Sequence, residues 1–131
     1  MTYKSQLGQL GENIACRYLV ENGFKIIERN FRQKWGEIDI IAKSPVKTLV
    51  FLEVKTVSIV SRETIETNNL NNQISAEDQL TKAKLKKLQR TASLYAGHWP
   101  ELIDDNKGWR IDLIALTIND KSYVIKQYEN I

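Results

Sequence analysis

Cysteine, histidine and proline are scarce in this chain of 131 residues, which contains one cysteine, one histidine and two prolines. Because Cys16 has no second cysteine to pair with, an intrachain disulfide and a cysteine-based metal site are both excluded. No apolar run approaches the roughly 18 residues of a membrane-spanning helix, and the first residues lack the hydrophobic core of a secretion signal. We therefore expect a cytoplasmic protein.

Glycine is missing from the long central stretch between Glu37 and Ala96, which excludes a glycine-rich phosphate-binding loop in that stretch. The chain as a whole is 42% hydrophobic and 27% charged, which is the ordinary composition of a globular protein. Its length is enough for one hydrophobic core and too short for two. We expect a single domain that spans residues 1–131.

The spacing of the apolar residues predicts two helices, at 6–22 and at 75–96, the second with Ser75 as its N-cap. Five strands are predicted, at 24–30, 36–42, 48–56, 109–117 and 122–128. The polar, asparagine-rich stretch 57–75 is predicted to be a long loop. This order of elements indicates an α/β fold in which helices flank a mixed β-sheet.

Two charged residues stand in the most apolar of these predicted strands, 48–56. Glu53 and Lys55 are two positions apart, so their side chains project from the same face of the strand. Burying charges is costly, and an apolar strand would normally carry uncharged groups at such positions. The pair therefore indicates a functional site, although a solvated ion pair on the exposed side of a sheet is the simpler alternative.

The preceding strand carries two more carboxylates on one face. Glu37 and Asp39 alternate with Ile38 and Ile40, which are expected on the opposite face. A short connection to the next strand predicts an antiparallel hairpin whose apolar faces align. We therefore expect four charged residues to gather on one surface, namely Glu37, Asp39, Glu53 and Lys55. Carboxylates grouped in this way favour a hard cation such as Mg²⁺ or Mn²⁺.

The order of these motifs resembles a known nuclease family. Gly36-Glu-Ile-Asp39 followed by Phe51-Leu-Glu-Val-Lys55 is similar to the core of the PD-(D/E)xK, or restriction-endonuclease-like, superfamily. Within it, the chain resembles the bacterial YraN-like family, which is similar to the archaeal Holliday-junction resolvases. Further matching segments are Gly8-Gln-Leu-Gly-Glu12, Gly23–Arg32 and Trp109-Arg-Ile-Asp112, so the resemblance covers nearly the whole chain.

The resemblance implies a restriction-endonuclease-like fold and a metal-dependent endonuclease that hydrolyses phosphodiester bonds in DNA, branched or structured DNA included. It implies that Asp39 and Glu53 bind Mg²⁺ or Mn²⁺ and that Glu12 helps to hold the metal. Lys55 would orient or deprotonate the attacking water. The family's pattern often has an arginine soon after Glu-Val-Lys and a shorter loop containing glycine. Here Val57 and an asparagine-rich loop stand instead, so the preferred substrate is open.

The basic residues concentrate in the second predicted helix. Lys84, Lys87 and Arg90 are candidates for contacts with nucleic acid, although such a run is more often a solvated helix face. Similarity to junction resolvases, which act as dimers, also makes a homodimer an expectation. The alternative to an enzyme is a non-catalytic nucleic-acid-binding module that retains the nuclease fold. A third reading is a protein-interaction domain that uses the loop at 57–75.

Overall fold

The structure is a computed structural model that describes residues 2–59 and 80–131. In chain order its elements are α1 (Tyr3–Glu21), β1 (Lys25–Gln33), β2 (Gly36–Lys43), β3 (Leu49–Ser58), α2 (Lys82–His98), the 3-10 helix η3 (Pro100–Leu102), β4 (Trp109–Ile118) and β5 (Tyr123–Tyr128). The predicted order of helices and strands is confirmed. The loop predicted at 57–75 starts later than expected because β3 continues to Ser58, and residues 60–75 lie outside the described residues.

The five strands form one mixed sheet in the order β1-β2-β3-β4-β5. β3 and β4 run parallel, whereas the other neighbouring strands are antiparallel. The predicted hairpin between β2 and β3 is present, and its pairs run from Lys43–Leu49 to Ile40–Leu52. The mixed α/β architecture is therefore confirmed. Over the described ranges, neither helix has the length and apolar character needed to cross a membrane.

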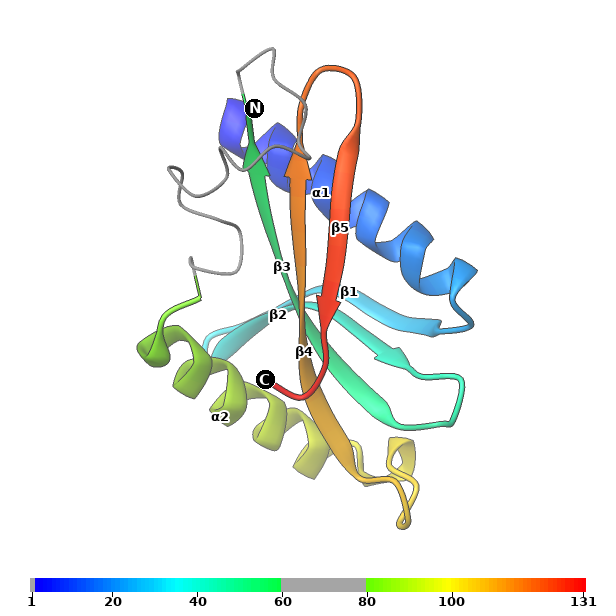
Figure 1. Ribbon diagram of the computed structural model, residues 1–131. Helices are drawn as coiled ribbons and strands as arrows, with labels where there is room; N and C mark the ends of the chain where they lie inside the picture. The colour runs from blue at the N-terminus through cyan, green and yellow to red at the C-terminus, as the bar shows by residue number, and fades with distance from the viewer. Residues whose placement is uncertain (1, 60–79) are drawn as a thin grey trace.

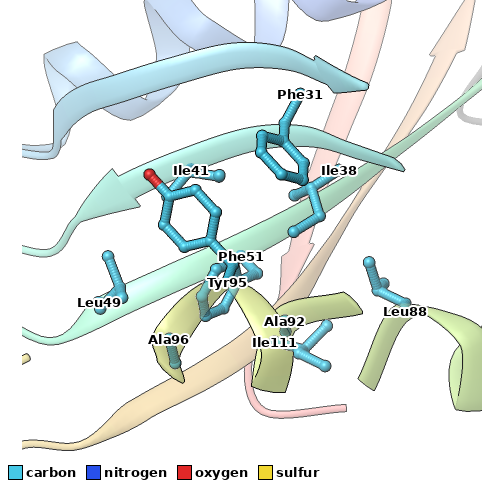
Figure 2. Packing of buried hydrophobic residues seen from close by; sticks show 10 residues of the cluster. All are labelled: Phe31, Ile38, Ile41, Leu49, Phe51, Leu88, Ala92, Tyr95, Ala96 and Ile111. Carbon is cyan, nitrogen blue, oxygen red and sulfur yellow. The ribbon is translucent and has the colours of Figure 1, made fainter. Parts of the chain in front are cut away.

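The two helices cover opposite faces of this sheet (Figure 1). On the α1 side, a core cluster joins the helix to the three central strands, and its buried members are Ala15, Leu19, Ile40, Ala42, Val50, Leu52 and Ile114. Figure 2 shows the cluster on the α2 side, which consists of Phe31, Ile38, Ile41, Leu49, Phe51, Leu88, Ala92, Tyr95, Ala96 and Ile111. The charged pair of β3 follows directly after the buried part of that strand.

Helix α1 is fixed at both ends and docks closely on β3. The Thr2 hydroxyl accepts a hydrogen bond from the Ser5 N–H at 3.1 Å, which caps the N-terminus. After the helix, Gly23 adopts a φ of 87°, a conformation that glycine takes without steric cost. A Cβ on Gly11 would collide with the Thr56 side chain. This close contact fixes α1 against the strand that carries Glu53 and Lys55, at the residue before Glu12.

Helix α2 begins at Lys82, so the predicted start at Ser75 is wrong. Leu80 and Thr81 are not helical, and Thr81 is the N-cap, because its hydroxyl accepts a hydrogen bond from the Lys84 N–H at 3.2 Å. Threonine is nearly as good a cap as serine, and the sequence pattern alone does not choose between them. Ser75 itself lies outside the described residues.

The predicted alternation of β2 is broken at Asp39. Ile38 belongs to the α2-side cluster and Ile40 to the α1-side cluster, although residues two apart were expected on one face. The change of face coincides with Asn30 on β1, which has a φ of 52° and lies between the pairs Arg29–Ile40 and Phe31–Ile38. A left-handed residue, which asparagine tolerates better than most, twists the strand locally. The site described next lies at this irregularity.

Candidate active site

Asp39 occupies the point where the pairing of β2 with β3 stops. The last paired residues are Ile40 and Leu52, and beyond them the Asp39 carboxylate takes the place of a backbone partner. Its Oδ2 accepts a hydrogen bond from the Val54 N–H at 2.9 Å. The side chain is 16% exposed, so the carboxylate is held by the sheet and still reaches its surface.

Glu53 and Lys55 form the second part of the site. Their side chains project from the same face of β3, and the distance from Lys55 Nζ to Glu53 Oε1 is 3.3 Å. Both side chains are 20% exposed. Phe51, two positions before Glu53 on the same strand, is fully buried. The predicted proximity of the two charges is therefore present, and the pair is largely withdrawn from solvent.

The two carboxyl groups influence each other strongly. Burial, together with the negative charge of Asp39, raises the pKa of Glu53 from its ordinary value of 4.5 to about 7, against the opposing effect of the Lys55 ammonium. Burial also raises the pKa of Asp39, although the Val54 N–H, Arg32 and Lys55 favour its ionised form. A hydrogen bond between the two carboxyl groups lowers the pKa of Asp39 and raises the pKa of Glu53. These are the directions expected when a protonated Glu53 donates to an ionised Asp39.

These residues line a cleft of about 480 Å³. One wall is the turn between β1 and β2, and the other is the first half of α2. All four charged residues that were expected on this surface line the cleft. The complete set of lining residues is Gln33, Lys34, Trp35, Gly36, Glu37, Asp39, Glu53, Lys55, Leu80, Lys84, Lys87, Leu88 and Thr91. The volume falls within the range of small-ligand sites in proteins.

The two walls of the cleft are held together by a close contact. A Cβ on Gly36 would collide with the side chain of Thr91 on α2. The Thr91 hydroxyl in turn donates a hydrogen bond to the Lys87 carbonyl at 2.9 Å. Because glycine is the one residue without a Cβ, this contact lets the β1–β2 turn lie directly against the helix.

Glu12, the fourth predicted site residue, does not line this cleft. It is partly buried on α1, and burial is the main cause of its raised pKa. The next cause is the negative charge of Asp39, while Arg32 and Arg29 act in the opposite direction. Glu12 is therefore close enough to interact electrostatically with Asp39 but is not part of the Asp39–Glu53 pair.

The three predicted nucleic-acid-binding residues do not have equivalent positions. Lys84 and Lys87 line the cleft together with Lys55, whereas Arg90 does not. All three are exposed on α2. Two of the three basic residues therefore lie at the same cleft as the carboxylates.

The donor set fits a hard divalent cation. Two carboxyl groups this close to each other are held together either by a shared proton or by a cation. Mg²⁺ typically uses only one or two protein carboxylates and completes its shell with water and phosphate oxygens. Asp39 and Glu53 would be those ligands. In residues 2–59 and 80–131, no group of three or more His, Cys, Asp or Glu side chains is arranged to hold a metal, so the predicted third ligand, Glu12, stays a prediction.

Arg32 is the residue at this site that sequence reasoning missed. Its guanidinium lies 3.8 Å from Asp39 Oδ1 and 3.8 Å from Glu37 Oε1. The sequence offered only its position in the segment Gly23–Arg32 that resembles the family, without a role. Trp35 packs edge-on against Phe31, with ring centroids 5.3 Å apart, and also lines the cleft.

Comparison with known proteins places the chain in a family. Residues 11–116 match the uncharacterised protein family UPF0102. The chain belongs to this family. A UPF0102 protein of Campylobacter jejuni is 37% identical over 124 residues, covering 95% of this chain and 91% of the relative. A UPF0102 protein of Caldicellulosiruptor bescii is 33% identical over 121 residues, covering 92% and 90% of the two chains.

A UPF0102 protein of a Sulfurihydrogenibium species is also similar, at 37% identity over 120 residues and 88% coverage of each chain. The resemblance to the YraN-like, or UPF0102, family seen in the sequence is thus confirmed. The matched range contains Glu12, Asp39, Glu53 and Lys55.

Proposed function

We propose that this protein is a metal-dependent endonuclease that hydrolyses phosphodiester bonds in DNA, branched or structured DNA included. One observation carries the proposal: Asp39, Glu53 and Lys55 line a single cleft whose opposite wall carries Lys84 and Lys87. Two adjacent carboxylates would repel a phosphate unless a cation stood between them. The lysines offer the complementary charge for a polyanion.

The geometry of the site supports the roles that we propose for these residues. A divalent cation bound by Asp39 and Glu53 would polarise the phosphodiester and make hydroxide available near neutral pH. The Val54 N–H fixes the Asp39 carboxylate at 2.9 Å, so this ligand is already oriented. The Lys55 ammonium, 3.3 Å from Glu53, would orient the attacking water and offset charge that develops on the phosphate.

Substrate binding is assigned to the lysines of α2. Lys84 and Lys87 lie three positions apart on the helix, so they occupy neighbouring positions on its surface. Both would contact backbone phosphates, which position a nucleic acid without reading its sequence. No step requires a covalent intermediate with the protein.

A non-catalytic nucleic-acid-binding module is the second candidate. The observation that favours it is the position of Glu12, the predicted third metal ligand, which does not line the cleft that holds Asp39 and Glu53. A protein that only binds phosphate, however, has no use for two adjacent buried carboxylates, which oppose that binding electrostatically. We therefore prefer the enzyme.

The deciding experiment is a cleavage assay with Mg²⁺ or Mn²⁺ on duplex, flap, four-way-junction, single-stranded and RNA substrates. We expect metal-dependent cleavage of at least one DNA substrate, lost in Asp39→Asn and Lys55→Ala. Lys126→Ala is the matched control, because it removes an exposed lysine of β5 that does not line the cleft. Binding without cleavage would support the second candidate, and cleavage that survives both site substitutions would refute the proposed site.

A further inference from the structure

Arg32, near the end of β1, lies beside the proposed metal ligands without being fully engaged by them. Its guanidinium is 3.8 Å from Asp39 Oδ1 and 3.8 Å from Glu37 Oε1. Both distances exceed the 3.2 Å that is usual for an N–H···O hydrogen bond. The Arg32 side chain is 46% exposed, so a ligand can reach it from solvent.

Few of the hydrogen-bond donors of Arg32 are used. An arginine side chain has five N–H donors in a planar fork. Within the part of the chain that the structure describes, Arg32 donates to the Phe31 carbonyl at 3.1 Å and to Asn30 Oδ1 at 3.5 Å. The second of these is long. The fork therefore retains donors that a further acceptor could use.

Orienting Asp39 does not account for Arg32. The Asp39 carboxylate is already held by the Val54 N–H at 2.9 Å, a contact almost 1 Å shorter than its distance to the guanidinium. Removing Arg32 would leave that backbone hydrogen bond in place. Charge neutralisation does not fully account for Arg32 either, because its single positive charge stands near several carboxylates, Glu12 and Glu37 among them, and cannot balance them all.

Lys55 and Arg32 lie next to different carboxylates of the proposed metal site. Lys55 contacts Glu53, and Arg32 lies next to Asp39. A phosphate held over the Asp39–Glu53 pair would therefore have a positive group near each carboxylate. The Arg32 fork matches the oxygens of a phosphate in a way that a lysine does not, because it can donate two parallel hydrogen bonds.

We propose that Arg32 binds a backbone phosphate of the nucleic acid, adjacent to the phosphate that lies over Asp39 and Glu53. This inference rests on the proposed function, since it requires a nucleic-acid substrate at this site. It assigns to β1 a phosphate-binding group that lies beside Asp39 and next in sequence to Gln33, which lines the cleft, in addition to the lysines of α2. Arg32 is a substrate-binding residue in this assignment and takes no part in the chemical step.

The test compares Arg32→Ala and Arg32→Lys with the wild type in two binding measurements. The first is the affinity for labelled duplex and single-stranded oligonucleotides, with Ca²⁺ in place of Mg²⁺, at several salt concentrations. We expect Arg32→Ala to weaken binding by about 10- to 100-fold, the range for one lost charge-assisted hydrogen bond. The slope of log affinity against log salt should fall by about one. Arg32→Lys should recover part of the affinity because it retains the charge.

The second measurement is Mn²⁺ affinity without nucleic acid. A phosphate-binding Arg32 predicts that Arg32→Ala binds Mn²⁺ as tightly as the wild type or more tightly, since a nearby positive charge has been removed. A positioning role for Asp39 predicts the opposite, a weaker affinity for Mn²⁺. Lys25→Ala is the control, because it removes one exposed positive charge from the start of the same strand, and both affinities should stay unchanged.

The outcomes separate this inference from the proposed function. Unchanged oligonucleotide binding in Arg32→Ala, or a loss of Mn²⁺ affinity that accounts for weaker binding, would overturn the role of Arg32 while wild-type cleavage still stands. A wild-type protein that binds DNA without cutting it, together with a weakened Arg32→Ala, would overturn the nuclease and support the phosphate site. If Arg32→Lys keeps the thermal stability of the wild type, a folding defect is excluded as the cause of its weaker oligonucleotide binding.

Discussion

The pKa of Glu53 leads to a prediction about stability that needs no substrate. In the folded protein this pKa is raised to about 7 from an ordinary value of 4.5, mainly because the group is buried and Asp39 lies beside it. Between these two pH values the folded state binds more protons than the unfolded state. The free energy of unfolding therefore falls as the pH rises through this interval, and the loss is complete above about pH 7.

Glu53→Gln should remove this loss. Glutamine has nearly the same shape as a protonated glutamate and can still donate a hydrogen bond to Asp39, but it does not ionise. The gap between a pKa of 4.5 and one of about 7 corresponds to about 3 kcal/mol. The side chain is 20% exposed, so little of this is lost to solvent screening. The Asp39–Glu53 pair titrates as a unit, and the figure applies to the pair.

The assay is urea denaturation of wild type and Glu53→Gln at pH 5 and pH 8, with a chelator present. We expect similar stabilities at pH 5 and a Glu53→Gln protein that is more stable by about 3 kcal/mol at pH 8. Glu37→Gln is the control, because it removes a carboxylate that is 68% exposed from the same cleft. Its difference from wild type should stay within about 0.5 kcal/mol. Parallel stability profiles for wild type and Glu53→Gln would refute the reasoning.

Three further predictions address the helix docking, the buried network of β4 and the site lysine. Gly11→Ala should lower the free energy of unfolding by about 1–3 kcal/mol, because the added Cβ meets Thr56. Gly8→Ala is the control in the same helix: its added Cβ meets nothing within 4 Å, so it should raise the free energy of unfolding by up to about 1 kcal/mol. Equal effects of the two substitutions in urea denaturation would contradict the docking. Asp112→Asn should lower the free energy of unfolding by about 3–5 kcal/mol in the same assay. The fully buried Asp112 carboxylate accepts hydrogen bonds from Arg110 Nε at 2.9 Å, Gln127 Nε2 at 2.8 Å and the Asn130 N–H at 2.9 Å. A loss of stability below about 1 kcal/mol would count against this network. Lys55→Ala should abolish cleavage and leave Mn²⁺ binding intact, whereas a loss of both would assign the lysine to holding the carboxylates.

The sequence predicted the elements and most of the cleft because both depend on local periodicity. The side chains of a strand alternate, so Glu53 and Lys55 had to share a face once β3 was identified. The short connection between β2 and β3 then required an antiparallel hairpin, which brought Asp39 near Glu53. These inferences need no knowledge of the distant parts of the fold.

The features that escaped prediction depend on backbone conformation or on tertiary docking. Asn30 adopts a φ of 52°, a conformation that asparagine tolerates but does not require, so the change of face at Asp39 could not be read from the pattern. Arg32 comes two residues after Asn30, so its proximity to Asp39 could not be read from the pattern either. The distance of Glu12 from the cleft depends on how α1 docks at Gly11. The start of α2 at Lys82 reflects a choice between two adequate caps, Ser75 and Thr81.

The central claim is that Asp39 and Glu53 form a divalent-cation site, and the most direct measurement of it is Mn²⁺ binding at pH 8, monitored by the electron paramagnetic resonance of the free ion. The experiment is run with and without an oligonucleotide. We predict binding by the wild type and by Glu37→Gln, and its loss in Asp39→Asn and Glu53→Gln. Absence of binding by the wild type under both conditions, or equal binding by Asp39→Asn, would contradict the claim.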